Sequence, residues 1–65
     1  MNTVEFYNLL EQKAISRTNC WQLTGHTIYW NGKLWSIGVN KTGDLYHSKE
    51  PWTLSIVKEL LDLKE

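Results

Sequence analysis

The dipeptide Asn31-Gly32 constrains the fold of this 65-residue chain more than any other feature. It separates two segments rich in β-branched and aromatic residues, 27–30 and 34–37. Asn-Gly is the preferred sequence of a two-residue type I′ turn, because both positions of that turn need a positive φ. The sequence therefore predicts a central antiparallel hairpin in which Ile28 lies opposite Trp35.

The register set by this turn assigns the hairpin side chains to two faces, because successive strand residues point to opposite sides of a sheet. One face is mostly large and apolar and is predicted to point inward: His26, Ile28, Trp30, Trp35, Ile37 and Val39. The other face is more polar and is predicted to point outward: Thr27, Tyr29, Leu34, Ser36 and Gly38. We expect a binding partner to lie on the second face.

A helix is predicted at the start of the chain. Asn2 followed by Glu5 is typical of an N-cap with its capping-box partner. Apolar residues then recur at helical spacing as far as Ala14 or Ile15. The residues expected to point inward are Phe6, Leu9, Leu10 and, as a further candidate, Ile15.

A second helix is predicted near the end of the chain. Pro51 suits its first turn, with Ser48, Glu50 or Thr53 as the cap. The apolar residues that then follow the helical period are Ile56, Val57, Leu60 and Leu63.

These segments combine in the order α-β-β-β-α, an α+β fold built as a single domain over residues 1–65. Besides the hairpin, a strand is predicted within 19–24, where Trp21 and Leu23 alternate with polar residues. A short edge strand at 45–47 is the alternative that would add a fourth. We expect a three-stranded or four-stranded antiparallel sheet with both helices on one face and the other face open to solvent.

Composition favours a cytoplasmic domain without a cofactor. Cys20 is the sole cysteine, so no intramolecular disulfide can form, and no Cys or His cluster has zinc-ligand spacing. No apolar run approaches the roughly 20 residues that a bilayer requires, and the first residues lack the pattern of a secretory signal. We expect no metal, no cofactor and no membrane association.

The charges are unevenly distributed, although the net charge is zero. Both ends of the chain are acidic, whereas the region between them holds both histidines and most of the bases. Those bases are Lys13, Arg17, Lys33, Lys41 and Lys49. A locally basic region favours a nucleic-acid partner. Chance scatter of the seven bases and seven acids explains the pattern equally well.

The chain has two histidines, His26 and His47, and histidine is the commonest general acid or base. His26 directly follows Gly25, whose lack of a Cβ atom allows a phosphate to approach. RNA cleavage by the 2′-hydroxyl also needs cations to stabilise the phosphorane. The candidate cations are Lys33, Arg17 and Lys49. The alternative is that His26 is an ordinary hydrogen-bonded residue, and its inward parity means that catalysis requires it to reach the rim of the sheet.

Tyrosines are the other candidates for contact with RNA. Tyr29 lies on the predicted outward face, and Tyr46 lies in the alternative edge strand. Both could stack on the bases of a single strand. The alternative is that they are ordinary cross-strand aromatic residues.

Three segments give the chain a resemblance to the HicA-like mRNA interferase toxins, a family with a double-stranded-RNA-binding-type α-β-β-β-α fold. Residues 5–13 are similar to the family's first helix. Residues 24–33 align without a gap with its signature, a G-S-H or G-N-H step followed by an apolar and aromatic strand and a short turn. Residues 53–58 are similar to its closing T-L-x-x-I-L-K helix, with one residue fewer between the Leu and the Ile.

The resemblance implies a metal-independent endoribonuclease of a toxin-antitoxin pair. By this match His26 takes the place of the catalytic histidine, mRNA is the substrate and a protein antitoxin is the partner. The sequence departs from the family in three places: Gly25 adjoins the histidine instead of preceding it by two residues, Trp30 stands where the family often has Arg, and Val39-Asn40 replaces a Pro-x-His. These departures affect substrate binding more than the fold.

Two other functions fit the sequence. Neutral charge, small size and four tryptophans favour a non-catalytic phage-type inhibitor, which would bind a host protein through the open sheet face or a sheet edge. The third interpretation is an RNA-binding domain that keeps the fold without the activity. Salt-dependent RNA binding without cleavage would distinguish it from the other two.

Overall fold

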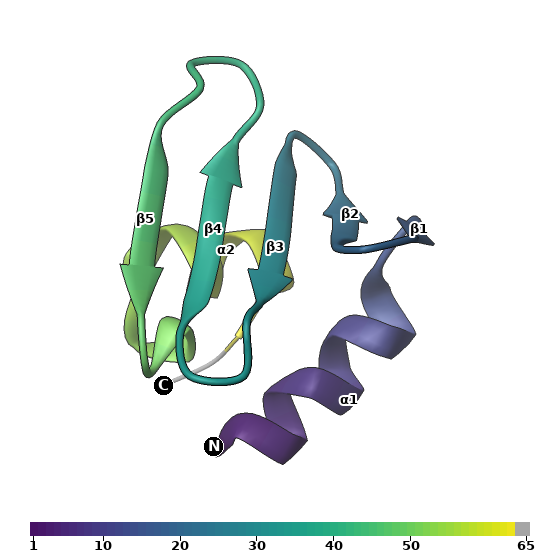
Figure 1. Cartoon of the computed structure of the whole chain (residues 1–65), viewed down its shortest axis with the longest axis vertical. Coiled ribbons are helices and arrows are strands. Elements are labelled where there is room, and N and C mark those ends of the chain that lie inside the picture. The colour runs from purple at the N-terminus through teal and green to yellow at the C-terminus, as the bar shows by residue number, and fades with distance from the viewer. Residues whose placement is uncertain (64–65) are drawn as a thin grey trace.

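A five-stranded antiparallel sheet forms the centre of the computed structural model, which describes residues 1–63. The strands lie in the sheet in chain order, so each pairs with its neighbour along the sequence (Figure 1). The elements are α1 (Thr3–Lys13), β1 (Ser16–Arg17), β2 (Trp21–Leu23), β3 (His26–Trp30), β4 (Trp35–Val39), β5 (Leu45–Ser48), the 3₁₀ helix η1 (Pro51–Thr53) and α2 (Ser55–Leu61). The α+β class is confirmed.

The number of strands differs from the prediction of three or four. β5 confirms the alternative edge strand at 45–47. β1 is the additional strand: Ser16 and Arg17 pair with Gln22 and Trp21. Both residues of β1 are exposed. A two-residue strand without a buried side chain has no alternation of apolar and polar residues, and so the sequence contains no signal for it.

The register of the β3–β4 hairpin also differs from the prediction, because the connecting loop has four residues, 31–34, instead of two. Trp30 pairs with Trp35, and Ile28 pairs with Ile37 rather than with Trp35. Gly32 has a φ of 96°, but Asn31 does not have the positive φ that a type I′ turn requires. Instead the Asn31 side-chain oxygen accepts hydrogen bonds from the backbone N–H groups of residues 33 and 34, at 2.8 Å each.

The predicted division of the hairpin between two faces is nevertheless confirmed for the residues that lie in strands. A register shift of two residues keeps every side chain on its own side of the sheet. Ile28, Trp35 and Ile37 are fully buried, whereas Tyr29 is exposed. Leu34 is the exception, because it belongs to the loop and not to β4.

Both helices pack on the same face of the sheet. Figure 1 shows α2 behind the central strands and α1 beyond β3, toward the side of β1 and β2. Residues from both helices join one buried cluster with the inward residues of the sheet: Phe6, Leu10, Trp21, Leu23, Ile28, Trp35, Ile37, Val57 and Leu61. The Phe6 ring packs edge-on against Trp35, with 4.8 Å between the ring centroids. One sheet face is therefore covered and the other is not.

The ends of the helices explain the remaining differences from the prediction. Asn2 is confirmed as the N-cap of α1, since its side chain accepts a 2.9 Å hydrogen bond from the Glu5 N–H. The prediction that Ile15 points inward is wrong: α1 ends at Lys13, and Ile15 is 72% exposed. Helical spacing has no meaning beyond the last helical residue.

The second helical segment is divided in two. Pro51 begins the 3₁₀ helix η1, after Glu50. Leu54 stands at the N-cap position of α2 and makes no side-chain cap hydrogen bond, so the helix lacks the polar cap that was expected at Ser48, Glu50 or Thr53. Among residues 1–63, no helix has the length and apolar content needed to cross a membrane.

Candidate functional site

The uncovered side of the sheet, called the open face here, is the sheet surface that the helices leave free. The strand register places eight residues on it: Ser16, Gln22, Thr27, Tyr29, Ser36, Gly38, Leu45 and His47. None of these side chains is a carboxylate, a lysine or an arginine. The open face is therefore formally neutral, with polar groups and a few apolar surfaces.

One row across the open face brings together Tyr29, Ser36 and His47, from β3, β4 and β5. Ser36 pairs with Tyr29 on one side and with His47 on the other. The Ser36 Oγ and the His47 Nδ1 lie 2.9 Å apart and share a hydrogen bond whose direction depends on the imidazole tautomer. Tyr29 is 45% exposed, and His47 is also exposed. Two flat rings thus stand on either side of a small hydroxyl residue.

The next row on the open face carries amide and hydroxyl groups. The Thr27 Oγ1 lies 3.0 Å from the Gln22 Oε1 and 2.9 Å from the Oδ1 of Asn40, in the turn after β4. A hydroxyl group has one hydrogen, so it donates to one of these oxygens at a time. Gly38 follows in the same row. A side chain there would come within 3.8 Å of the Leu45 side chain. The row therefore has no side chain at Gly38 and carries the polar groups of Gln22 and Thr27 at one end.

Two lysines lie at the end of the sheet nearest the Tyr29 row. Lys33 is in the β3–β4 loop and Lys49 follows β5, and the antiparallel order puts both at the same end of the strands (Figure 1). Both side chains are exposed. In the part of the chain that the structure describes, neither forms a salt bridge. Their charges are thus available to an anion that lies across the open face.

His26, the predicted catalytic residue, lies at the opposite end of β3. It is half-buried and points to the helix-covered side, and its Nδ1 lies 3.2 Å from the Thr24 carbonyl oxygen. Gly25 precedes it with a φ of 75°, and no atom lies within 4 Å of where a Cβ would be. His26 therefore reaches the rim of the sheet beside an open turn. It lies about 10 Å along the strand from Tyr29 and on the other face.

The structure does not bring the three predicted cations to His26. Lys33 and Lys49 lie at the other end of the sheet. Arg17 lies on β1, where its guanidinium forms a 2.9 Å salt bridge with Glu11 and a 3.1 Å hydrogen bond to the Tyr7 hydroxyl. The same group stacks over the Trp21 ring, 4.9 Å from its centroid. Arg17 thus anchors the edge of the sheet to α1.

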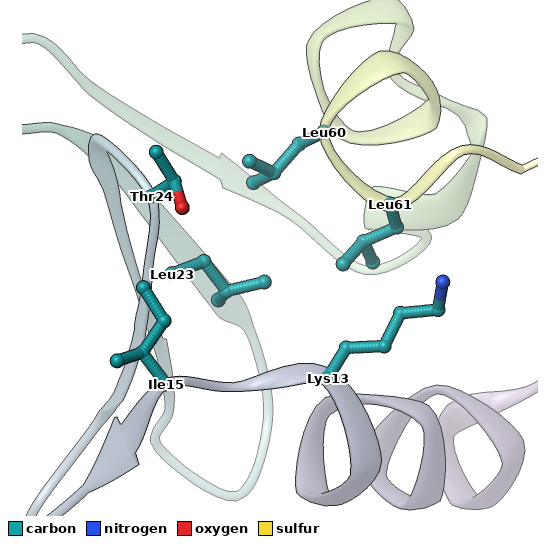
Figure 2. Close-up of a pocket in the computed structure, with 6 residues that line it drawn as sticks. All are labelled: Lys13, Ile15, Leu23, Thr24, Leu60 and Leu61. Carbon is teal, nitrogen blue, oxygen red and sulfur yellow. The ribbon is translucent and has the colours of Figure 1, made fainter.

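A hollow of about 260 Å³ lies between the end of α1, β2 and α2. Figure 2 shows the leucines of α2 facing Ile15 and Leu23 across it. Its lining residues are Lys13, Ile15, Leu23, Thr24, Leu60 and Leu61. Lys13 is the only titratable group among them, so the hollow lacks the acid and base pair that RNA cleavage needs. Within residues 1–63, no group of three metal-ligating side chains is present either.

The sequence did not place His47 on the outward face of the sheet, although His47 lies on the open face. Its pairing with Ser36 depends on the length of the loop between β4 and β5, in which Gly43 has a φ of 78° and its N–H donates a 2.7 Å hydrogen bond to the Val39 carbonyl. The signal available was the alternation of Leu45 and His47 around Tyr46.

No protein-family model matches the chain, and comparison with curated proteins and with solved structures finds no significant match.

Proposed function

We propose that the chain is a small RNA-binding domain that takes single-stranded RNA on the open face. One observation carries the proposal. Tyr29 and His47 stand in a single row on an uncovered antiparallel sheet that bears no acidic side chain. Sheets that bind single strands in this way stack unpaired bases on exposed aromatic side chains.

The spacing of the two rings suits neighbouring bases of a splayed strand. Tyr29 and His47 are separated by one intervening strand, which corresponds to roughly 10 Å between them at a strand spacing of about 4.8 Å. Ser36 between them is small and leaves room for the sugar and phosphate that connect the two bases. Base stacking on an aromatic side chain is worth about 1 to 3 kcal/mol per base.

The charges around the open face support an anionic ligand such as RNA over a basic protein surface. Lys33 and Lys49 lie at one end of the open face, close to where the phosphates of a strand stacked on Tyr29 and His47 would lie. The face itself contains no carboxylate that would repel these phosphates. Two phosphate contacts on a single strand correspond to a salt slope of about −1.4 in log K against log salt. The proposal therefore implies moderate affinity and a shallow salt dependence.

The test compares two tyrosines of nearly equal exposure on opposite sides of the sheet. Tyr29 on the open face is 45% exposed, and Tyr46 on the helix-covered side of β5 is 46% exposed. Fluorescence anisotropy with a labelled, unstructured RNA oligonucleotide measures the affinity of each alanine variant. Tyr29→Ala should weaken binding at least about fivefold, as expected for one lost stacking contact. Tyr46→Ala should leave it unchanged.

Equal losses in both variants, or no RNA binding by the unchanged chain, would contradict the proposal. A different result would favour the inhibitor interpretation. The chain would then have no affinity for RNA, it would be recovered with a stoichiometric protein partner, and Tyr29→Ala would abolish binding of that partner.

RNA cleavage at His26 is a second candidate function, in line with the resemblance to the HicA-like toxins. It is favoured by the open space beside Gly25 and the partial exposure of His26. In this reaction His26 removes the proton of a 2′-hydroxyl, whose oxygen attacks the adjacent phosphorus. The bond to the 5′-oxygen breaks and that oxygen takes up a proton, which yields a cyclic 2′,3′-phosphate and a 5′-hydroxyl. A protein antitoxin would have to cover this end of the sheet.

The two candidates are distinguished by the histidine on which each depends. Cleavage of an RNA oligonucleotide by the unchanged chain and by His47→Ala, but not by His26→Ala, would support the second function. RNA that stays intact with all three proteins would contradict it and leave the binding proposal unaffected.

A further inference from the structure

The two edges of the sheet differ in how well they are protected from pairing with another strand. An edge strand presents unpaired N–H and C=O groups, and proteins usually block them with short strands, charged side chains, prolines or bulges. β1 is protected: it has two residues, and one of them is Arg17, held against α1 by Glu11. β5 has four residues, Leu-Tyr-His-Ser, with no lysine, acid or proline among them.

The backbone groups on the outer side of β5 can be identified from the hairpin that it forms with β4. The Val39 N–H donates to the Asp44 carbonyl at 2.8 Å, so residues 39 and 44 form a hydrogen-bonded pair. Hydrogen-bonded and non-bonded pairs alternate along an antiparallel ladder. The backbone of Tyr46 therefore points to β4, and the N–H and C=O groups of Leu45 and His47 point outward.

We propose that the outer edge of β5 pairs with the same edge of a second copy of this chain. The symmetry of such a dimer limits the register. Two antiparallel edges are related by a twofold axis perpendicular to the sheet, which keeps the open faces of both copies on one side. The axis must then pass through a residue paired with itself, and Tyr46 and His47 are the two central residues of β5.

Charge selects between these two registers. Centring on His47 leaves only residues 46–48 paired within β5 and brings Asp44 of each copy toward Glu50 of the other, which lies beyond the end of the strand, so like charges approach each other twice. Centring on Tyr46 places Asp44 opposite Ser48 of the other copy, beside its Lys49. Leu45 then lies opposite His47 of the other copy, and each such pair exchanges two backbone hydrogen bonds.

The side chains of β5 support the Tyr46-centred register. Leu45 is 59% exposed on the open face and Tyr46 is 46% exposed on the other face, so pairing would cover one apolar side chain on each side of the sheet. A four-residue strand pair is nevertheless small beside the roughly 1,200 Å² of a stable, specific interface. The dimer therefore forms at high protein concentration and dissociates on dilution.

Sedimentation equilibrium over a range of concentrations tests this inference. The apparent mass should rise from that of one chain toward that of two. Leu45→Pro removes an N–H group that points away from β4, so no hydrogen bond to β4 is lost. Prolines are also tolerated on edge strands. This variant should stay monomeric at concentrations at which the matched variant Leu45→Val dimerises. A chain that is monomeric at every concentration, or a dimer that Leu45→Pro leaves intact, would overturn the inference.

Amide hydrogen exchange gives a second readout that needs no substitution. The amides of Leu45 and His47 should become more protected as the protein concentration rises, because only these amides of β5 point outward. Protection of the Tyr46 amide, which already faces β4, should not change. Concentration-dependent protection elsewhere on the chain with none at these two amides would assign the dimer to another surface and contradict the β5 edge.

Discussion

The two faces of the sheet are built from alternate residues of the same strands, yet they have opposite chemistry. Ile28 and Tyr29 are consecutive in β3, and Ser36 lies between Trp35 and Ile37 in β4. Ile28, Trp35 and Ile37 are fully buried under the helices, whereas Tyr29 is exposed and Ser36 is partly exposed. The comparison shows that the residues that stabilise the fold and the residues proposed to bind RNA lie on different sides of one backbone. Substitutions one residue apart should therefore have separable effects.

The largest expected effect is on the helix-covered face. Phe6→Ala removes a fully buried ring that packs against Trp35, and such a change costs about 3 to 5 kcal/mol. A domain of this size rarely has more than about 3 to 5 kcal/mol of stability in total. We expect this variant to be largely unfolded at room temperature, as measured by circular dichroism.

Val4→Ala is the matched control for that variant, because Val4 lies on the same helix and is 68% exposed. It should change the free energy of unfolding by less than about 0.5 kcal/mol. Similar losses in both variants would mean that α1 is not packed on the sheet by Phe6.

A smaller effect is expected at the loop that joins the central strands. Asn31→Ala removes the acceptor of two backbone N–H groups, which water can partly replace because the loop is exposed. The expected loss is about 1 kcal/mol, which corresponds to a fall in melting temperature of about 4 to 8 °C. An unchanged melting temperature would show that the loop conformation does not depend on the Asn31 side chain.

On the open face the expected effect is on binding and not on stability. His47→Ala should weaken RNA binding by about tenfold, the equivalent of about 1.4 kcal/mol of stacking. His26→Ala, at the far end and on the other face, should change the affinity less than about twofold. Anisotropy titrations of both variants measure this difference. A larger loss from His26→Ala than from His47→Ala would move the binding site to the rim.

The smallest expected effect belongs to the two lysines at the end of the open face. Replacing either Lys33 or Lys49 by alanine should reduce the magnitude of the salt slope by about 0.7, the value for one phosphate contact on a single strand. Titrations at several salt concentrations measure the slope. Lys41, in the loop between β4 and β5 at the opposite end, provides the control and should leave the slope unchanged.

Sequence periodicity was sufficient for the presence of both helices, although not for their ends, and for the central strands and the division of residues between faces. It could not give the loop length, because Asn31 acts as a hydrogen-bond acceptor within the loop instead of adopting a positive φ. β1 left no signal, since two exposed residues show no period. The candidate site was predicted only in part: Tyr29 follows from strand parity, whereas His47 depends on the β4–β5 register, which the alternation of residues alone does not give.

Chemical-shift mapping during an RNA titration tests the central claim most directly, because it reports every described residue at once. The account predicts that the largest perturbations fall on Tyr29, Ser36 and His47, with smaller ones at Lys33 and Lys49. The residues of α2 on the covered face should not respond. Perturbations centred on α2 or on the turn at Gly25, with none on the Tyr29 row, would contradict binding at the open face.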